Sequence, residues 1–420
     1  MSTELPQDLA GWLQWIEAGH PAQIELGLER VGQVARRLPI DLDGGCNIVL
    51  AGTNGKGSTL TLLDAMLTSA GLTTGSYTSP HLLRFNERIC LSGQPVDDAT
   101  LCRAFTLIEQ VRGGIPLTYF EYGTLAALLI FSWHPVDVAL LEVGLGGRLD
   151  AVNIVAADIA LVTTIALDHT DWLGPDRASI GREKAGIFRP GKPALCGDPD
   201  PPATLVDYAR AVGAPLQRQG VDFGYERHGD HWSWYGGGVR REALPLPALP
   251  LPNAALALAA LQHLPQPIPE PSIREGLARA RLQGRLQSVQ LGRVRAIVDV
   301  AHNPEAAGYL ARWLSQRPCR GQVHLILGML ADKDIEAVVR ALVPVVDIWH
   351  PVSLEVPRGA SRERLEAALR SAGVSADRVR GADSVAAAID QLQSLSAADQ
   401  LLLTGSFVTV AQALERAKQE

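Results

Sequence analysis

The stretch NIVLAGTNGKGSTLTLLDAMLTSA, residues 47–70, decides the fold of the first part of the chain. Its apolar run Asn47 to Ala51 is typical of a buried strand, and Thr59 to Ala70 has the composition of a helix. Between them lies the glycine-rich turn AGTNGKGST, in which backbone N–H groups can converge on a phosphate while Lys56 adds positive charge. The stretch therefore predicts a strand, a phosphate-binding loop and a helix in succession.

The loop departs from the strict GxxxxGK[ST] pattern of phosphate-binding loops. Gly57 intervenes between Lys56 and Ser58, and the first glycine lies three rather than five residues before Gly55. An ordinary turn before a helix is the alternative interpretation. The strand, the glycines, the lysine and the hydroxyls nevertheless occur in the order that a phosphate cradle requires, so a phosphate site is favoured.

Short apolar runs continue to alternate with helix-like stretches, which is the pattern of βαβ units and a mostly parallel sheet. The further strand candidates of the first part are Thr74 to Thr78, Asp137 to Glu142 and Asp158 to Ile165. The Pro-rich stretch from Arg241 to Pro252 is expected to be an extended connector, because proline fits neither a helix interior nor a central strand. A capped helix is expected from Asn253 onward.

A second alternating series begins at Val294 and predicts a separate α/β domain. Its expected strands are Val294 to Val300, Val323 to Gly328, Val345 to Trp349 and Gln400 to Thr404, and its expected helices begin at Asp334, Arg362 and Val408. The predicted organisation is a first domain over residues 1–284, a linker over 285–293 and a smaller second domain over 294–420. The length of 420 residues agrees with two domains, because it exceeds the size at which one core stops growing.

The composition argues against several classes of protein. The chain is 47% hydrophobic and 20% charged, and its formal net charge of −7 disfavours a broad cationic surface for nucleic acid. Its five cysteines are scattered without CxxC spacing, so neither a disulfide framework nor a zinc site is indicated. The N-terminus lacks a basic region followed by an apolar core, and no apolar run approaches membrane-spanning length. We expect a monomeric cytoplasmic protein that binds neither nucleic acid nor a membrane.

Four polar side chains fall just beyond four separate predicted strands of the first part. They are Lys56, Ser79 in YTSPHL, Glu142 in LLEVGLGGRLD and His169 in ALDHTDWLG. Because the carboxyl ends of adjacent parallel strands line one crevice, we expect these side chains to meet around a nucleotide and its metal ion. Ser79, Glu142 and phosphate oxygens suit Mg²⁺, whereas His169 is a less usual ligand. Taken singly, three of them have ordinary alternative roles: Ser79 as a turn hydroxyl, Glu142 as a solvated strand end and His169 as a helix cap.

Lys184 lies in PDRASIGREKAGIFRPG, where Ile180, Lys184 and Ile187 fall on one helical stripe. A lysine on an apolar stripe usually extends its amine to the solvent, and the residues alone favour that interpretation. The alternative is a desolvated amine that reacts with CO₂ and becomes an anionic metal ligand.

Two loops of the second half also place polar residues at strand ends. VDVAHNPEA carries Asp299, His302 and Asn303 before a predicted helix, and Ser406 precedes the last helix. Both loops are expected at the same edge of their sheet, where they could face the nucleotide site of the first domain. A capping turn is the alternative interpretation of the VDVAHNPEA loop.

Taken together, these segments resemble the folylpolyglutamate synthase and dihydrofolate synthase family, within the Mur ligase superfamily. The matching stretches run in family order along nearly the whole chain and are IELGLERV, AGTNGKGST, TSPHL, NERI, TYFEYGTLAA, LEVGLGGRLDAVN, DHTDWLG, IGREKAGIFR and DVAHNP. The resemblance implies an α/β protein with an N-terminal P-loop ATPase-like domain, built on a mostly parallel sheet, and a smaller C-terminal Rossmann-like domain. It also implies an ATP-dependent ligase in which the γ-phosphate passes to a substrate carboxylate and the amine of L-glutamate attacks the acyl phosphate.

The resemblance further assigns roles to individual residues. The phosphates of ATP are assigned to Asn54, Gly55, Lys56, Gly57 and Ser58, and other ATP contacts to Asn253, Arg285 and Asp299. The metal ion is assigned to Ser79, Glu142 and His169, with Lys184 as the lysine that becomes carbamylated. The pterin side is assigned to His20, Thr118, Tyr119, Phe120, Glu121, Leu149 and Asp150, and the glutamate side to His302 and Ser406. The candidate catalytic residues among these are Lys56, Lys184, His169 and His302.

The implied cofactors are ATP and Mg²⁺, with a monovalent cation as a further candidate, and the implied substrates are dihydropteroate, reduced folates and L-glutamate. The segment GHPAQIELGLERV favours the bacterial type with both synthase activities over polyglutamylation alone. A peptidoglycan-precursor ligase is an alternative within the superfamily, but the chain length and the TYFEYG and DHTDWLG segments favour folate. A P-loop switch ATPase, which would hydrolyse ATP without an amine acceptor, is the alternative from a different class.

Overall fold

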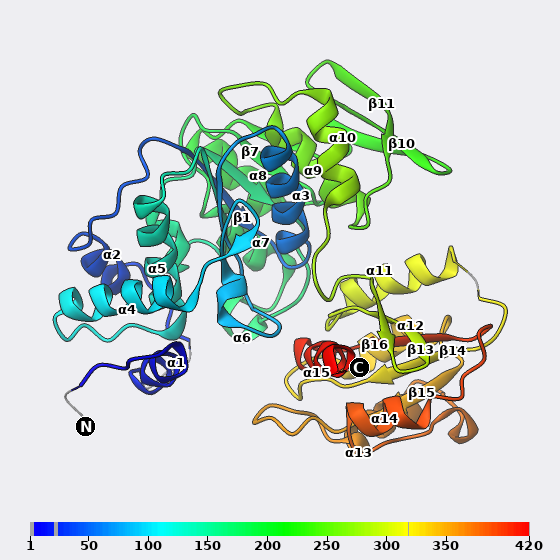
Figure 1. Cartoon of the computed structure of the whole chain (residues 1–420). Coiled ribbons are helices and arrows are strands. Elements are labelled where there is room, and N and C mark those ends of the chain that lie inside the picture. Colours follow the sequence, from blue (N-terminus) through cyan, green and yellow to red (C-terminus); the bar gives the residue numbers. More distant parts are fainter. Residues whose placement is uncertain (1–3, 21–23, 318, 420) are drawn as a thin grey trace. The chain divides into compact units, whose positions relative to one another are not determined.

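A computed structural model describes residues 4–20, 24–317 and 319–419, and Figure 1 colours them along the sequence. The chain divides into two compact units, Met1–Arg281 and Leu282–Glu420. Each unit is built around its own mainly parallel β-sheet, and helices connect the strands. The α/β class predicted from the sequence is therefore confirmed.

The first unit is built on an eight-stranded sheet with the strand order β4-β3-β2-β5-β1-β6-β7-β8. The strands are β1 (Cys46–Ala51), β2 (Thr74–Tyr77), β3 (Ile89–Leu91), β4 (Gln94–Pro95), β5 (Val138–Glu142), β6 (Ile159–Val162), β7 (Ala194–Cys196) and β8 (Leu216–Arg218). Neighbours from β2 to β8 pair in parallel, while β3 and β4 add antiparallel strands at one edge. The four strands that the sequence predicts here, β1, β2, β5 and β6, are consecutive neighbours in this sheet.

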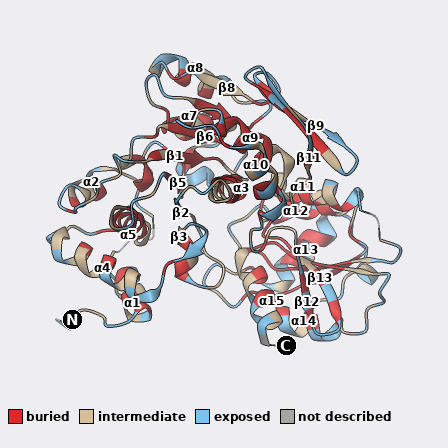
Figure 2. Ribbon diagram, turned by 45° about the horizontal axis from the view of Figure 1, so that its top comes forward, coloured by how far each residue is buried: buried red, intermediate tan, exposed pale blue. Residues whose placement is uncertain are grey.

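The central strands are apolar because helices cover the sheet. Every residue of β5 and β6 is buried, as expected for parallel strands between helical layers. The helices of this unit are α1 (Leu9–Ala18), α2 (Glu29–Ala35), α3 (Lys56–Ser69), α4 (Asp98–Arg112), α5 (Tyr119–Trp133), α6 (Thr170–Leu173), α7 (Arg177–Ala185), α8 (Ala203–Val212), α9 (Leu251–Leu261) and α10 (Glu270–Arg279), with the 3₁₀ segments η1 (Phe85–Arg88) and η2 (Ala151–Ile154). Figure 2 shows that α3 and α5 are largely buried, in keeping with their packing against β2.

A small antiparallel sheet with the order β11-β10-β9 also belongs to the first unit and was not predicted. Its strands are β9 (Phe223–His228), β10 (His231–Gly236) and β11 (Val239–Pro245). Trp232 and Trp234 are fully buried, and the indole N–H of Trp234 donates to the carbonyl of Ala255 in α9 at 3.0 Å. Tryptophan packing therefore attaches this sheet to the rest of the unit.

The Pro-rich stretch over residues 241–252 is extended where it starts, because its first residues lie in the edge strand β11. The following helix α9 begins at Leu251 rather than at Asn253, with Pro252 in its first turn. Proline is tolerated there because the first N–H groups of a helix have no partner within the helix.

The second unit is built on a five-stranded sheet with the order β12-β13-β16-β14-β15. Its strands are β12 (Gln287–Leu291), β13 (Val294–Val298), β14 (Val323–Leu327), β15 (Ile348–Pro351) and β16 (Gln400–Thr404). Its helices are α11 (Pro304–Ser315), α12 (Ile335–Leu342), α13 (Arg362–Ser371), α14 (Val385–Gln391) and α15 (Phe407–Gln419), with the 3₁₀ segment η3 (Ala376–Arg378). β12 pairs antiparallel with β13, and the other pairs are parallel.

Two details of the second unit differ from the expectation. The segment 285–293, expected to be a linker, contains β12 and so contributes to the sheet. The strand expected from Val345 begins at Ile348 instead, because the N–H groups of Val345 and Val346 donate to the Leu342 carbonyl and close the turn after α12. Among the described residues, no helix is both long and apolar enough to cross a membrane.

Candidate active site

The glycine-rich loop lies between the end of β1 and the start of α3, as the sequence predicts. Gly52 and Gly55 have φ angles of +148° and +89°, which favour glycine. A Cβ atom on Gly52 would overlap the hydroxyl of Thr163, and a Cβ on Gly55 would lie 2.6 Å from Oδ1 of Asn253. The loop therefore requires glycine at both positions, for backbone conformation and for space.

The first turn of α3 is suited to bind an anion. Its N-cap residue is Gly55, which has no side chain to occupy the first N–H groups, and the helix dipole places partial positive charge there. The Lys56 amine donates to the carbonyls of Gly52 at 2.9 Å and Thr53 at 3.3 Å, so it folds back over the loop. Backbone N–H groups and one amine are thus gathered where a phosphate would bind.

The carboxyl ends of four neighbouring parallel strands bring several predicted residues to one edge of the sheet. Ser79 follows β2, Glu142 ends β5, Lys56 follows β1 and His169 follows β6, and these strands are consecutive in the sheet. The N–H of Ser79 donates to Oε2 of Glu142 at 3.2 Å, and Oε1 of Glu142 lies 4.0 Å from the Lys56 amine. The structure therefore joins Ser79, Glu142 and Lys56 in one polar cluster.

His169 lies at the same edge of the sheet as the N-cap of the short helix α6. Its φ angle is +52°, its side chain is 40% exposed, and its N–H donates to Oδ1 of Asp168 at 2.9 Å. Its Nε2 atom is 3.9 Å from the same carboxylate oxygen. His169 occupies the capping position considered as its ordinary role, but its side chain makes no capping hydrogen bond. Its role as a metal ligand stays a prediction.

The donor atoms of this edge fit a magnesium ion bound together with a nucleotide. Within the described ranges, no group of three His, Cys, Asp or Glu side chains is arranged to hold a metal ion. Mg²⁺ does not need such a group, because it is commonly bound by one or two protein oxygens, phosphate oxygens and waters. Glu142 supplies a carboxylate that is 6% exposed, and the adjacent Ser79 supplies a hydroxyl.

Lys184 lies in the last turn of α7 and is 3% exposed. The helix ends at Ala185, so Ile187 lies beyond it and the predicted stripe is shorter than expected. Burial disagrees with an amine that extends into the solvent, which was the interpretation favoured by the residues alone. Burial instead agrees with the desolvated side chain of the alternative interpretation.

The segment LEVGLGGRLDAVN packs against the helix that carries Lys184. A Cβ atom on Gly147 would lie 3.0 Å from the carbonyl oxygen of Lys184. The N–H of Arg148 donates to the Glu183 carbonyl at 2.9 Å, and the Asn153 amide donates to the Gly186 carbonyl at 3.2 Å. The end of α7 is therefore fixed by the loop that follows Glu142.

Thr118 and Glu121, assigned to the pterin side, form a capping box at the start of α5. The Glu121 carboxylate accepts from the Thr118 N–H at 2.7 Å, and the Thr118 hydroxyl accepts from the Glu121 N–H at 3.2 Å. Arg30 also donates to Glu121 at 3.2 Å. These bonds give both residues a structural role, and their contact with a pterin stays a prediction.

The two aromatic residues of the same segment are partly buried and pack against the first unit's core. The ring of Phe120 lies 5.8 Å from that of Tyr77, and a Cβ atom on Gly144 would come within 2.6 Å of it. The ring of Tyr119 lies 5.7 Å from that of Phe85. Phe120 thus lies beside the loop that begins after Glu142.

Asp150 is a fully buried carboxyl in the loop after β5. It accepts hydrogen bonds from the N–H groups of Leu145 at 2.8 Å and Val152 at 3.0 Å. Burial raises its pKa to about 7, although these backbone hydrogen bonds and the charge of Lys56 act in the opposite direction. Asp150 therefore titrates near neutral pH within the candidate site region.

The N-terminal segment contributes a charged cluster that reasoning from the residues alone missed. Nε2 of His20 lies 3.3 Å from Glu25, Glu25 pairs with Arg30, and Arg30 contacts Glu121. The carbonyl of Leu149 accepts from the Gly27 N–H at 3.1 Å, which joins the same segment to the loop after β5. Residues 21–23, which separate His20 from the rest of this cluster in the sequence, lie outside the described residues. The signal in the sequence was the IELGLERV stretch, which contains Glu25 and Arg30 but contributed only to the family resemblance.

In the second unit, the predicted residues gather at the ends of β13 and β16. Asp299 is buried and accepts from the N–H groups of Leu286 and Ala301, each at 2.9 Å. Burial raises the pKa of Asp299, although the neighbouring Arg285 lowers it in part. This carboxylate therefore holds two segments of backbone together, whatever ligand it meets.

Phe407, which the sequence analysis did not select, lies between two of the candidates. The Arg285 guanidinium lies 5.5 Å above its ring, and the ring of His302 lies 6.1 Å from it. The Ser406 hydroxyl accepts from the Thr409 N–H at 3.0 Å and so caps the first turn of α15. An aromatic residue directly after a glycine-serine turn was the available signal.

Comparison with known proteins gives consistent results along the chain. Residues 284–407 match the family model described as Mur ligase, glutamate ligase domain. The chain is 49% identical over 408 residues to the dihydrofolate synthase/folylpolyglutamate synthase of Escherichia coli strain K12, covering 97% of this chain and 95% of that protein. It is 39% identical to the protein of the same name from Haemophilus influenzae, covering 98% of both.

Solved structures agree with these relatives. The E. coli FolC protein in complex with DHPP and ADP superposes with a TM-score of 0.94 at 48% identity, covering 100% of both chains. A bifunctional folylpolyglutamate synthase/dihydrofolate synthase with Mn, AMPPNP and L-glutamate bound superposes with a TM-score of 0.91 at 46% identity, covering 98% of this chain and 99% of that one.

Proposed function

Because this chain belongs to the dihydrofolate synthase/folylpolyglutamate synthase family, we propose that it is an ATP-dependent ligase that joins L-glutamate to dihydropteroate and to reduced folates. The observation that carries the proposal is the cluster of Lys56, Glu142 and Ser79 beside the glycine loop at one edge of the large sheet. Full-length similarity to proteins with both synthase activities supports both reactions in this chain. ATP and a divalent metal ion are the cofactors.

The reaction needs ATP because an ionised carboxylate is a poor electrophile. An oxygen of the substrate carboxylate attacks the γ-phosphorus of ATP and ADP leaves, which gives an acyl phosphate. The amine of L-glutamate then attacks the carbonyl carbon, loses a proton and expels inorganic phosphate through a tetrahedral intermediate. The products are the amide, ADP and phosphate.

The first unit's residues account for the binding of the nucleotide. The N–H groups at the start of α3 and the Lys56 amine hold the phosphates, and the Asn253 side chain packs beside Gly55. Ser79 and Glu142 would hold the metal ion, and His169 is proposed as a further ligand. When bound, Mg²⁺ neutralises the charge that develops on the transferred phosphoryl group.

We assign the remaining candidates in the same way. Buried Lys184 is proposed to carry a carbamate that adds a negative charge near the metal ion. Asp150 and Phe120 are proposed on the pterin side with the other residues named above, and Asp150 would hold or move a proton near neutral pH. In the second unit, Arg285 and Asp299 are assigned to ATP, and His302 and Ser406 to glutamate.

We also propose that the protein acts in the cytoplasm. Its substrates ATP and L-glutamate are abundant there, and all five cysteines are free, which suits a reducing compartment. Fractionation of cells that produce the chain with an epitope tag would check this location.

The test of the proposed function is release of inorganic phosphate from ATP with two acceptors varied independently. We expect release only when L-glutamate is present together with dihydropteroate or tetrahydrofolate. Release without any acceptor would instead indicate a switch ATPase, and release with tetrahydrofolate but not dihydropteroate would indicate polyglutamylation alone. A response to a nucleotide-linked sugar peptide would indicate a peptidoglycan-precursor ligase.

A further inference from the structure

The chain just after β6 forms the wall of the glycine loop. The Thr53 N–H donates to the Thr164 carbonyl at 2.7 Å, and the Ala166 N–H donates to the Thr53 hydroxyl at 3.0 Å. The Asn54 N–H donates to the Thr164 hydroxyl at 3.2 Å, and the Thr163 hydroxyl donates to the Asn54 carbonyl at 2.6 Å. The position of Thr53 and Asn54 therefore depends on where residues 163–166 lie.

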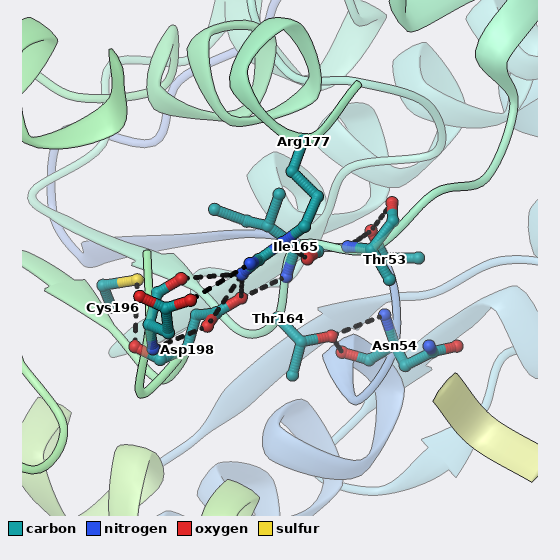
Figure 3. A network of polar contacts seen from close by, with 9 residues as sticks. Thr53, Asn54, Thr164, Ile165, Arg177, Cys196 and Asp198 are labelled. Atoms are coloured by element: carbon teal, nitrogen blue, oxygen red, sulfur yellow. Dashed lines mark hydrogen bonds and ion pairs between the residues drawn. The ribbon is translucent and has the colours of Figure 1, made fainter. Parts of the chain in front are cut away.

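The same short segment is held on its other side by one ion pair. The Ile165 N–H donates to Oδ2 of Asp198 at 2.8 Å, and the Ile165 carbonyl accepts from Nε of Arg177 at 2.8 Å. Because successive peptide groups of an extended chain point in opposite directions, Thr164 and Ala166 bond to the loop while Ile165 bonds to the pair. Figure 3 shows this arrangement, with Ile165 between Arg177 and the loop residues Thr53 and Asn54.

Asp198 is the centre of this network. Its side chain is 8% exposed, and it follows β7, the neighbour of β6 in the sheet. In addition to the Ile165 N–H, the Asp198 carboxylate accepts from the Asp200 N–H at 2.9 Å and from the Arg177 guanidinium at 3.2 Å. Arg177 also donates to the Asp200 carbonyl at 2.7 Å. A buried carboxylate with this many partners has little freedom to move.

Arg177 connects the network to a second candidate element. It is the first residue of α7, the helix whose last turn carries Lys184. A Cβ atom on Gly181, in the middle of this helix, would lie 3.6 Å from Cδ1 of Ile165, so α7 packs directly on the wall segment. The ion pair thus fixes both the wall of the glycine loop and the start of this helix.

We infer that Asp198, through its ion pair with Arg177, is a positioning residue for the nucleotide site: it holds the Ile165 peptide so that Thr164 and Ala166 keep the glycine loop in its phosphate-binding shape. The inference rests on the proposed function for the identity of the nucleotide. Neither residue is required to touch ATP. Removal of the negative charge of Asp198 releases the Arg177 fork and leaves one acceptor oxygen for two backbone N–H groups.

The chain offers a matched control at the opposite end of the same strand. Asp158 immediately precedes β6, accepts from the Asn47 N–H at 3.0 Å and pairs with Lys192 at 2.9 Å. It therefore makes the same kinds of bond as Asp198, to a backbone N–H and to a cation, away from the glycine loop. Asp158→Asn should weaken the sheet without changing the nucleotide site.

The experiment compares Asp198→Asn, Arg177→Gln and Asp158→Asn in the full chain. Titration calorimetry with MgADP measures nucleotide affinity, and steady-state kinetics measure KM for ATP and for dihydropteroate. We expect the Asp198 and Arg177 variants to bind MgADP about tenfold or more weakly and to have a KM for ATP that is raised by a similar factor. This matches the loss of one hydrogen bond to a charged group. The KM for dihydropteroate and the affinity of Asp158→Asn for MgADP should stay within about twofold of the wild-type values.

Thermal unfolding separates positioning from loss of the fold. Equal loss of MgADP affinity in Asp158→Asn, or wild-type affinity in both network variants, would overturn the inference. If Asp198→Asn does not fold, Arg177→Gln decides the question, because the Arg177 side chain is 40% exposed and its replacement leaves Asp198 bonded to Ile165. Failure of the proposed function is separate, since it would appear as phosphate release by the wild-type chain without acceptors, while the MgADP titration would still report on Asp198.

Discussion

At the carboxyl edge of the large sheet, the Lys56 amine and Glu142 carboxylate lie 4.0 Å apart beside a glycine loop, whereas at the corresponding edge of the second sheet the polar side chains mainly hold backbone. Asp299 accepts two N–H groups, and Ser406 caps a helix. In both sheets the parallel topology brings the carboxyl ends of the strands to one edge, whether or not the residues there bind a ligand. The difference teaches that polar residues at strand ends can serve the fold alone, and that what distinguishes the first edge is a pair of opposite charges beside an anion-binding loop.

The largest expected effect is that of Lys56→Ala at the first edge. Loss of its charge should reduce kcat for ligation by about 10²–10³-fold, the usual effect of removing one group that stabilises transferred charge. Steady-state phosphate release with dihydropteroate and L-glutamate measures it. Lys192→Ala, which removes a lysine from the amino end of the same sheet, is the control and should keep its activity. Full activity of Lys56→Ala would remove the contrast between the edges.

Lys184→Ala should come next, because it removes the buried amine while leaving the glycine loop in place. We expect very low ligation that short carboxylates such as formate or acetate restore in part, since they can occupy the place of a carbamate. Arg182→Ala, an exposed neighbour on the same helix, should behave as wild type with and without these additives. High activity of Lys184→Ala without additives would show that the amine has only a packing role.

A pH series distinguishes Asp150 from an ordinary carboxylate. Its pKa is raised from 3.8 to about 7 by burial, so between these values the folded chain keeps a proton that the unfolded chain has lost. Stability should therefore fall as the pH rises through this window, by up to about 1 kcal/mol per pH unit relative to Asp150→Asn. Urea unfolding between about pH 4.5 and pH 6.5 measures the slope.

The control for this series is Asp137→Asn. The hydroxyl and N–H of Thr73 hold the pKa of Asp137 below its ordinary value, so its titration lies below the window and adds no slope there. A wild-type stability that runs parallel to that of Asp150→Asn across the window would contradict the burial of a protonated carboxyl.

The smallest effect is expected at the second edge, from Ser406→Ala. Loss of the helix cap should lower the stability of the second unit by about 1 kcal/mol. The Ser384 hydroxyl accepts from the Ala387 N–H and caps α14 in the same way. Ser384→Ala therefore serves as the control in thermal unfolding. If Ser406→Ala alone raises the KM for L-glutamate, this hydroxyl has a use beyond the fold. Equal KM values in both variants would leave it as a cap.

The parts of the fold that local pattern specifies were predicted well. The strands that end at Ala51, Tyr77 and Glu142 lie within a residue of their expected positions, because buried parallel strands are continuous apolar runs bounded by glycine or polar residues. Their adjacency in the sheet, and hence the meeting of Lys56, Ser79 and Glu142, followed from the topology rule.

The parts that depend on distant contacts were not predicted. The sheet β9 to β11 and strand β12 are antiparallel pieces that were not recognised in the sequence, and they pack against α9 and β13. The pairing of Arg177 with Asp198 joins a helix start to a strand end and has no spacing in the sequence that would reveal it. In contrast, Thr118 and Glu121 do show the T-x-x-E pattern of a capping box, and that local signal was overlooked in favour of a ligand role.

The contact of Gly55 with Asn253 has a consequence for the order in which the protein is made. The loop and the wall segment after β6 emerge early from the ribosome, but Asn253, which packs against Gly55, is supplied by α9 after every strand of the large sheet has been synthesised. A nascent chain that stops short of Asn253 carries the whole glycine motif and yet lacks the side chain that packs against Gly55. The ability to hold a nucleotide should therefore appear late in translation, when the first unit is nearly finished.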